Sequence, residues 1–106
     1  MRIGEDLAYR QFSVLLTQGG DRVAVEERQN SVAHRSEFHL VVTAATSGDV
    51  DLKVSELSGK LAGVVTVVDS NNNMTVFNQP VVDGVFTITV PGAAVGQGTF
   101  MTGVFI

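Results

Sequence analysis

The chain has 106 residues, of which 44% are hydrophobic and 17% are charged, and its formal net charge is −4. This length and apolar content are enough for one folded domain, residues 1–106, with a core of its own. The absence of cysteine excludes disulfides and thiolate metal sites. Nucleic-acid binding is disfavoured because no cluster of basic residues with interleaved aromatics occurs.

The start of the chain argues against export and membrane insertion. Charged side chains occur from Arg2 onward, so the apolar core of a secretion signal is missing and we expect no signal peptide and synthesis in the cytoplasm. Thr, Asp, Asn, Pro and Gly interrupt every apolar run before it reaches the roughly 20 residues of a membrane span. We therefore expect no membrane partner.

The first third of the chain predicts a lead-in and a hairpin. Residues 1–11 are interpreted as a possible N-terminal arm. Apolar and polar residues then alternate over 12–17, the glycines of 18–21 favour a turn, and Val23 and Val25 indicate a returning strand.

A polar segment, residues 26–35, follows and is interpreted as an exposed loop that reverses at Asn30 and Ser31. A short helix is the competing interpretation. Residues 37–43 and 49–54 alternate strictly and predict two strands that pair or lie in facing sheets. The residues expected to face inward from the first of these are Phe38, Leu40, Val42 and Ala44.

The second half is dominated by β-branched residues and turns. Residues 64–68 predict a central strand covered on both faces, and residues 69–73 a turn that closes a second hairpin. Asp83-Gly84 is a strong signal for a further hairpin, and 86–90 and 99–106 predict the closing strands. About eight short strands with no helix predict an all-β fold, an antiparallel β-sandwich of jelly-roll or immunoglobulin-like type, with a small barrel as the open alternative.

Two acidic clusters are candidate cation sites. Asp69-Ser70-Asn71-Asn72-Asn73 matches the first ligand positions of a calcium loop. The sixth position is Met74 and the twelfth is Pro80, so the required glycine and bidentate glutamate are missing, and a plain turn is the preferred interpretation. Asp49 and Asp51 share one strand face, where alternating carboxylates are typical of a solvent-exposed surface.

The two histidines suggest another metal site. His34 and His39 with Glu37 offer imidazole and carboxylate ligands for a transition metal, but no further ligand is evident. The stretch Gly92 to Gly98 precedes no helix and is therefore not a phosphate cradle. We predict no metal, no cofactor and no enzyme activity.

Charge is distributed very unevenly along the chain. Of the 18 charged residues, 16 lie in residues 1–60, which leaves only Asp69 and Asp83 in residues 61–106. Solvent-facing strand positions normally carry Lys and Glu to remain soluble and to block edge pairing. Either these strands are mostly central and their threonines suffice, or this half is covered by other subunits, which is the interpretation we prefer.

The closing segments resemble a known class of module. Residues 83–91 (DGVFTITVP) and 98–106 (GTFMTGVFI) are similar to the closing strands of immunoglobulin-like baseplate and tail modules of tailed phages, and they also suit the small β-sandwich cement proteins that decorate capsids. The resemblance covers the last 24 residues. It implies a structural role in a virion and no catalytic residues.

The resulting prediction is a non-enzymatic capsid cement or decoration protein, made in the host cytoplasm and located in the virion. It would self-associate and bind other virion proteins such as the major capsid protein, with residues 26–35 and the N-terminal arm as further contacts. The alternative is a carbohydrate- or receptor-binding module of a tail or adhesin, using residues 71–73, Phe77 and Asn78. The predicted interface positions are Val85, Thr87, Thr89, Phe100, Met101 and Phe105.

Overall fold

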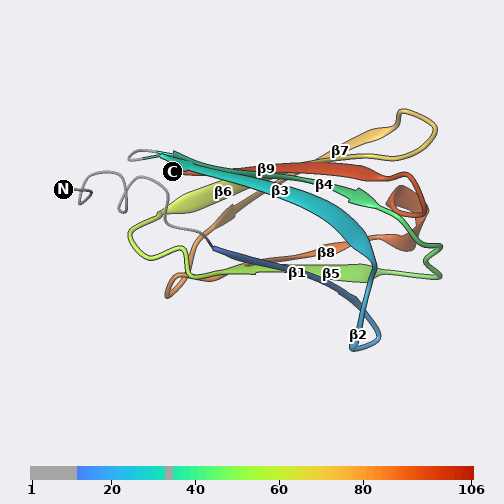
Figure 1. Ribbon diagram of the computed structural model, residues 1–106, viewed down its shortest axis with the longest axis horizontal. Helices are drawn as coiled ribbons and strands as arrows, with labels where there is room; N and C mark the ends of the chain where they lie inside the picture. Colours follow the sequence, from blue (N-terminus) through green and yellow to red (C-terminus); the bar gives the residue numbers. More distant parts are fainter. Residues whose placement is uncertain (1–11, 33–34) are drawn as a thin grey trace.

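Two antiparallel sheets lie face to face in the computed structural model, which describes residues 12–32 and 35–106 (Figure 1). The four-stranded sheet has the order β2 (Asp21–Arg22), β1 (Ser13–Gln18), β5 (Val50–Ser55), β8 (Phe86–Val90). The five-stranded sheet has the order β3 (Val25–Val32), β4 (Arg35–Val42), β9 (Phe100–Phe105), β6 (Ala62–Val68), β7 (Met74–Pro80). The predicted all-β sandwich is confirmed. The N-terminal arm expected over residues 1–11, like His34, lies outside the described residues.

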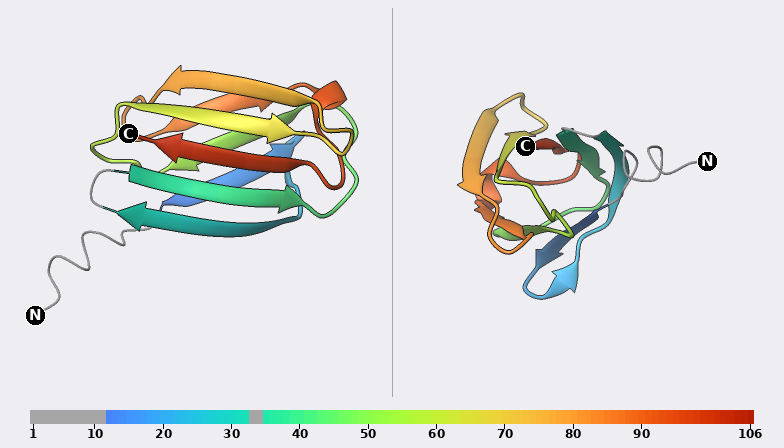
Figure 2. Two further views of the ribbon diagram at one scale, coloured as in Figure 1. Left: turned by 90° about the horizontal axis from the view of Figure 1, so that it is seen from above. Right: turned by 90° about the vertical axis from the view of Figure 1, so that its left-hand side faces the viewer.

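The strand order shows how the chain connects the two sheets. Three neighbouring strand pairs are local hairpins: β1–β2 in the four-stranded sheet, and β3–β4 and β6–β7 in the five-stranded sheet. After β3–β4 the chain crosses to β5, and after β6–β7 it crosses to β8. The last strand, β9, is inserted between β4 and β6 (Figure 2). The five-stranded sheet is therefore complete only when the C-terminal strand is in place.

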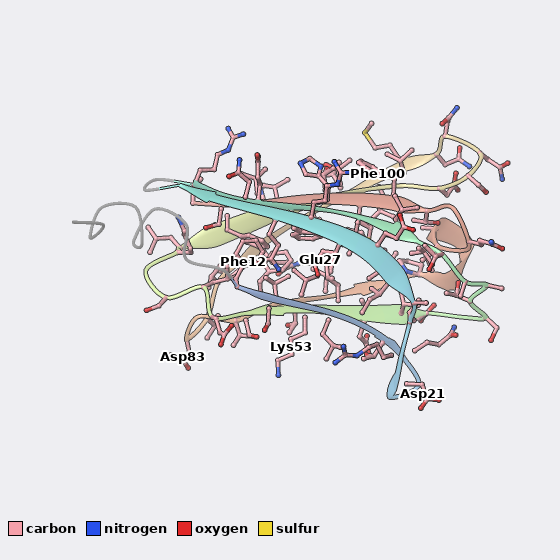
Figure 3. All side chains as sticks on the ribbon, viewed as in Figure 1. Phe12, Asp21, Glu27, Lys53, Asp83 and Phe100 are labelled. Carbon is pink, nitrogen blue, oxygen red and sulfur yellow. The ribbon has the colours of Figure 1, made fainter. Side chains whose placement is uncertain are left out.

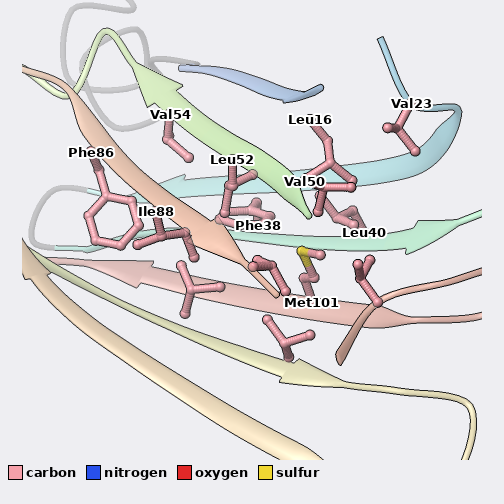
Figure 4. Packing of buried hydrophobic residues seen from close by; sticks show 14 of the residues in the cluster. Leu16, Val23, Phe38, Leu40, Val50, Leu52, Val54, Phe86, Ile88 and Met101 are labelled. Carbon is pink, nitrogen blue, oxygen red and sulfur yellow. The ribbon is translucent and has the colours of Figure 1, made fainter. Parts of the chain in front are cut away.

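The core lies between the sheets and follows from strict alternation along the strands. Phe38, Leu40 and Val42 of β4 are buried, as expected from the sequence, and so are alternate residues of β5 and β8 (Figure 4). Ala44 is only half-buried. Of the described residues, none belongs to a helix long and apolar enough to cross a membrane.

Four phenylalanines form the centre of one end of this core. The ring of Phe105 stacks on Phe38 with 6.0 Å between centroids and meets Phe86 and Phe12 edge to face at 5.3 and 5.8 Å. Two buried glycines, Gly63 and Gly103, lie beneath these rings, where a Cβ atom would collide with them. The aromatic cluster therefore depends on neighbouring strands that carry no side chain at these positions.

The prediction of an exposed loop over residues 26–35 is wrong, and so is the competing prediction of a short helix. β3 runs from Val25 to Val32 and pairs with β4 throughout, with Asn30 opposite Glu37 and Ser31 opposite Ser36. The segment can be polar and still form a strand because β3 is an edge of its sheet, and charges on edge strands block unwanted pairing. Glu26, Glu27 and Arg28 are all exposed.

Two details of the second half also differ from prediction. The strand over 64–68 is not covered on both faces, because Val64 is 39% exposed on the outer side. The Asp83-Gly84 turn has the two positive φ angles, 52° and 76°, that its residues favour. It closes only a bridge between Val82 and Val85, since β7 and β8 belong to different sheets.

Candidate interaction surface on the five-stranded sheet

The outward residues of β9, β6 and β7 form a surface without charge. Because side chains alternate along a strand, the residues between the buried ones point to solvent. The backbone register sets them side by side in three rows across the three strands. We call this surface the uncharged face; its residues are Phe100, Thr102, Val104, Val64, Thr66, Val68, Met74, Val76 and Asn78.

Several apolar side chains of the uncharged face are open to solvent. Met74 is 67% exposed, Val76 56%, Val64 39% and Phe100 38%. Single exposed apolar residues are normal on proteins, whereas a contiguous group of them marks an interaction surface. Phe100 projects from the outer side of the five-stranded sheet, opposite to Lys53 on the other sheet (Figure 3).

The charges of this sheet lie on one side only, along β3 and β4. Glu26 and Arg28 face outward from β3, and Glu37 and His39 from β4. The Arg35 guanidinium donates to Glu37 Oε2 at 2.8 Å, and this hydrogen bond is the main cause that holds the pKa of Glu37 below its usual value. The outer face of the five-stranded sheet is thus divided into a charged strip on β3 and β4 and the uncharged face on β9, β6 and β7.

A shallow hollow of about 530 Å³ lies at the boundary between the two. The ring of Phe100 forms one wall and is 6.1 Å from the ring of His39, tilted by 37°. The hollow combines an aromatic wall, an aliphatic floor and a charged rim, and it is lined by Glu26, Glu27, Arg28, His39, Leu40, Val41 and Phe100.

The outer face of the four-stranded sheet has a different character. Asp51 and Lys53 of β5 point outward, and the hydroxyl of Thr89 donates to Asp51 Oδ1 at 2.9 Å. A hollow of about 580 Å³ on this side is lined by polar and apolar residues together, among them Asp51, Lys53 and Leu15. The outer face of this sheet therefore carries charges, which β9, β6 and β7 lack.

The six predicted interface positions do not lie together. Met101 and Phe105 are fully buried, so predicting them as contact residues was wrong: they alternate with Phe100 and face the core. Phe100 belongs to the uncharged face, whereas Thr87 and Thr89 are exposed on the opposite sheet. The sixth, Val85, is half-buried beside the Asp83-Gly84 turn.

The most exposed members of the uncharged face were missed. Val64, Met74 and Val76 were not singled out because the sequence shows low charge but not which strands are neighbours. The alternation in β6, where Val65 and Val67 are buried, is the signal that could have identified Val64.

The acidic turn after β6 uses its carboxylate within the turn. Asp69 Oδ1 accepts the backbone N–H of Asn71 and of Asn73, each at 2.9 Å, and Asp69 Oδ2 accepts the Asn73 side-chain amide at 3.2 Å. These hydrogen bonds, the one from the Asn73 backbone first, lower the pKa of Asp69. The preferred interpretation of a turn is consistent with this geometry, in which the carboxylate closes the β6–β7 hairpin.

We expect this turn to lose stability in acid. The pKa of Asp69 is lower in the folded state than its ordinary value of 3.8, so its contribution is fully present above that pH and disappears as the pH falls through the folded value. Asp69→Asn should lower the midpoint of urea unfolding at pH 7, and the difference from the native protein should shrink below about pH 4. A difference that stays constant down to pH 3 would contradict the role of the carboxylate charge.

The other candidate cation sites are not assembled. Asp49 Oδ1 accepts the Gly92 N–H at 2.8 Å, while Asp51 is engaged by Thr89, so the two carboxylates serve separate contacts. Within residues 12–32 and 35–106, no group of three or more His, Asp or Glu side chains could hold a metal ion. Glu37 and His39 share the outer face of β4, as expected, and His34 lies outside the described residues.

The residues of the carbohydrate-binding alternative do not converge either. Asn73 donates its backbone N–H and its side-chain amide to the Asp69 carboxylate within the turn, and Asn71 donates its backbone N–H. Phe77 is half-buried and packs against the core, whereas the neighbouring Asn78 points outward from the uncharged face. No ring with adjacent amides is therefore presented to solvent by these residues.

The fold and the surface define the class: an antiparallel two-sheet β-sandwich whose five-stranded sheet carries the uncharged face beside a charged strip. No protein-family model, no curated protein and no solved structure matches the chain.

Proposed function

We propose that the protein is a non-enzymatic structural component of a virus particle, a capsid cement or decoration protein whose uncharged face is covered when it self-associates and binds the shell. The observation that carries the proposal is the uncharged area on one outer face of the sandwich. β9, β6 and β7 contain no charged residue, whereas the neighbouring strands β3 and β4 and the outer face of the four-stranded sheet carry charges. The virion setting rests on the resemblance of residues 83–91 and 98–106 to closing strands of phage modules.

The mechanism is burial of apolar β surface. Covering the exposed side chains of the uncharged face stabilises a complex by about 25 cal/mol per Å² of apolar area removed from water, before the costs of association. The threonines of this face can satisfy their hydroxyls within an interface or with trapped water. The charges of β3 remain accessible at the rim, where charges act on orientation and association rate.

The test is attachment to assembled shells of the virus whose genome encodes the chain. Val76→Glu places a carboxylate in the uncharged face, and Thr87→Glu places the same charge on the opposite sheet, where Lys53 is its cross-strand neighbour. We expect the native protein and Thr87→Glu to co-sediment with empty shells and Val76→Glu to remain in the supernatant, because an interface charge without a partner is costly.

Both variants should fold, since Val76 and Thr87 are exposed, and their melting temperatures serve as the check. A native protein that does not sediment with the shells at any concentration would refute the decoration role. Equal binding by both variants would show that attachment uses another surface.

A further inference from the structure

We infer that the occupant of the uncharged face is a second copy of the chain, packed sheet on sheet about a two-fold axis parallel to the strands. The inference rests on the proposed function in that it assigns a partner to the same face. The axis lies between β9 and β6, beside the cross-strand pair of Thr66 and Thr102. β4 of each copy then faces β7 of the other, and β9 faces β6.

The first row of this arrangement is apolar on both sides. Along that row the register places Val41, Phe100, Val68 and Met74 in adjacent strands. The two-fold axis sets Met74 of the second copy over Val41 and the hollow beside Phe100. Met74 is the most exposed apolar residue of the uncharged face. A methionine side chain adapts to irregular gaps, and its sulfur makes favourable contacts with aromatic rings.

The polar groups also meet suitable partners. In the third row, Asn78 of the second copy lies over Glu37, to which its amide can donate a hydrogen bond. In the middle row, the hydroxyls of Thr66 and Thr102 lie opposite each other. In the same row the imidazole of His39 lies over an aliphatic side chain of the other copy, and Glu37, the carboxylate that these three rows cover, has a polar partner.

A two-fold axis perpendicular to the strands fits less well. It would exchange the first and third rows and set Glu37 of one copy over Val41 of the other. That geometry buries a carboxylate against an aliphatic side chain, and it also opposes the charged strips of β3 directly. The charge pattern therefore selects the parallel axis, which leaves Glu26 and Arg28 at the rim.

The face is large enough for such a contact. Four strands, β4, β9, β6 and β7, overlap the second copy; spaced by about 4.8 Å and about seven residues long at about 3.3 Å per residue, they project to roughly 440 Å². The accessible area exceeds this projection because the side chains stand out from the sheet, which brings it toward the roughly 800 Å² per partner of a standard interface. Facing sheets of this kind pack with aligned strands in β-sandwiches.

The first experiment is sedimentation velocity of the purified protein without shells. A chain of 11.2 kDa should sediment as a dimer. Met74→Glu should raise the dimer dissociation constant by at least about 100-fold, because its carboxylate would lie over Val41 and beside Glu26 of the other copy, whereas Thr87→Glu should leave it within about 3-fold. A native protein that is monomeric at every concentration, or equal effects of the two variants, would overturn the inference.

The second experiment tests the orientation and uses the absence of native cysteine. The double variant Val41→Cys/Met74→Cys should give a covalent dimer with a short bismaleimide, because each cysteine lies over the other type in the second copy. Neither single variant should do so, since like residues lie at opposite sides of the interface. Cross-linking of the single variants as efficient as that of the double variant would refute the parallel axis.

The outcomes separate this inference from the proposed function. A monomer in solution whose Val76→Glu variant fails to bind shells would leave the decoration role intact and remove the dimer. A dimer that Met74→Glu dissociates, but that never binds shells, would establish the dimer and remove the decoration role.

Discussion

Replacing Phe105 by alanine should lower the free energy of unfolding by about 4 kcal/mol, because truncating a fully buried aromatic ring loses its burial and leaves a cavity. The ring contacts Phe12, Phe38 and Phe86 and therefore joins both sheets. The neighbouring strands cannot collapse into the space without breaking their register. Since small domains have total stabilities of about 5–15 kcal/mol, this variant should be close to unfolding.

The matched control is Phe100→Ala, which removes the same ring from the other face of the same strand. It is expected to cost less than about 1 kcal/mol in the monomer, because Phe100 is 38% exposed. Urea titration in the Met74→Glu background measures both without a contribution from association. Equal destabilisation by the two variants would contradict the assignment of Phe105 to the core.

Gly103→Ala is expected to destabilise the protein by about 2–3 kcal/mol, although alanine normally suits a strand better than glycine. Gly103 has an ordinary backbone angle, but a Cβ there would collide with ring carbons of Phe38. That ring is held against Phe105 at 6.0 Å and has no room to move aside. The added methyl group must therefore displace the aromatic cluster or the strand.

Gly96→Ala is the control, since a Cβ there meets nothing within 4 Å and its φ is not positive. It should be neutral or stabilise by about 0.4–1 kcal/mol, because alanine restricts the unfolded chain. Chemical denaturation at a single pH compares the two variants. A Gly103→Ala protein as stable as the native one would show that the core at this end is loosely packed.

The fold class could be predicted because alternation is a local property. In β4, β5 and β8 the apolar residues recur at every second position, and all of these strands were located from the sequence. The turns at Gly19-Gly20 and Asp83-Gly84 were recognisable for the same reason, since the positive φ angles they need are a preference of the residues themselves.

β3 could not be predicted because what makes it a strand is its neighbour. Its sequence is polar on both faces, and only the pairing with β4 shows that it is a protected edge. Which residues of β9 face the core could not be predicted for a related reason. Phe100, Met101 and Phe105 are all apolar, so composition alone does not indicate which of them faces the core.

The sequence by itself determined that this is a cysteine-free all-β domain whose second half is almost without charge. Only the tertiary structure decided between a sandwich and a barrel, and showed where that lack of charge appears. β9, β6 and β7 come from separate parts of the chain, and the backbone register places their outward residues side by side on one sheet. A surface depends on which strands are neighbours, and hydrogen bonding between distant segments sets that order, whereas alternation along one strand does not.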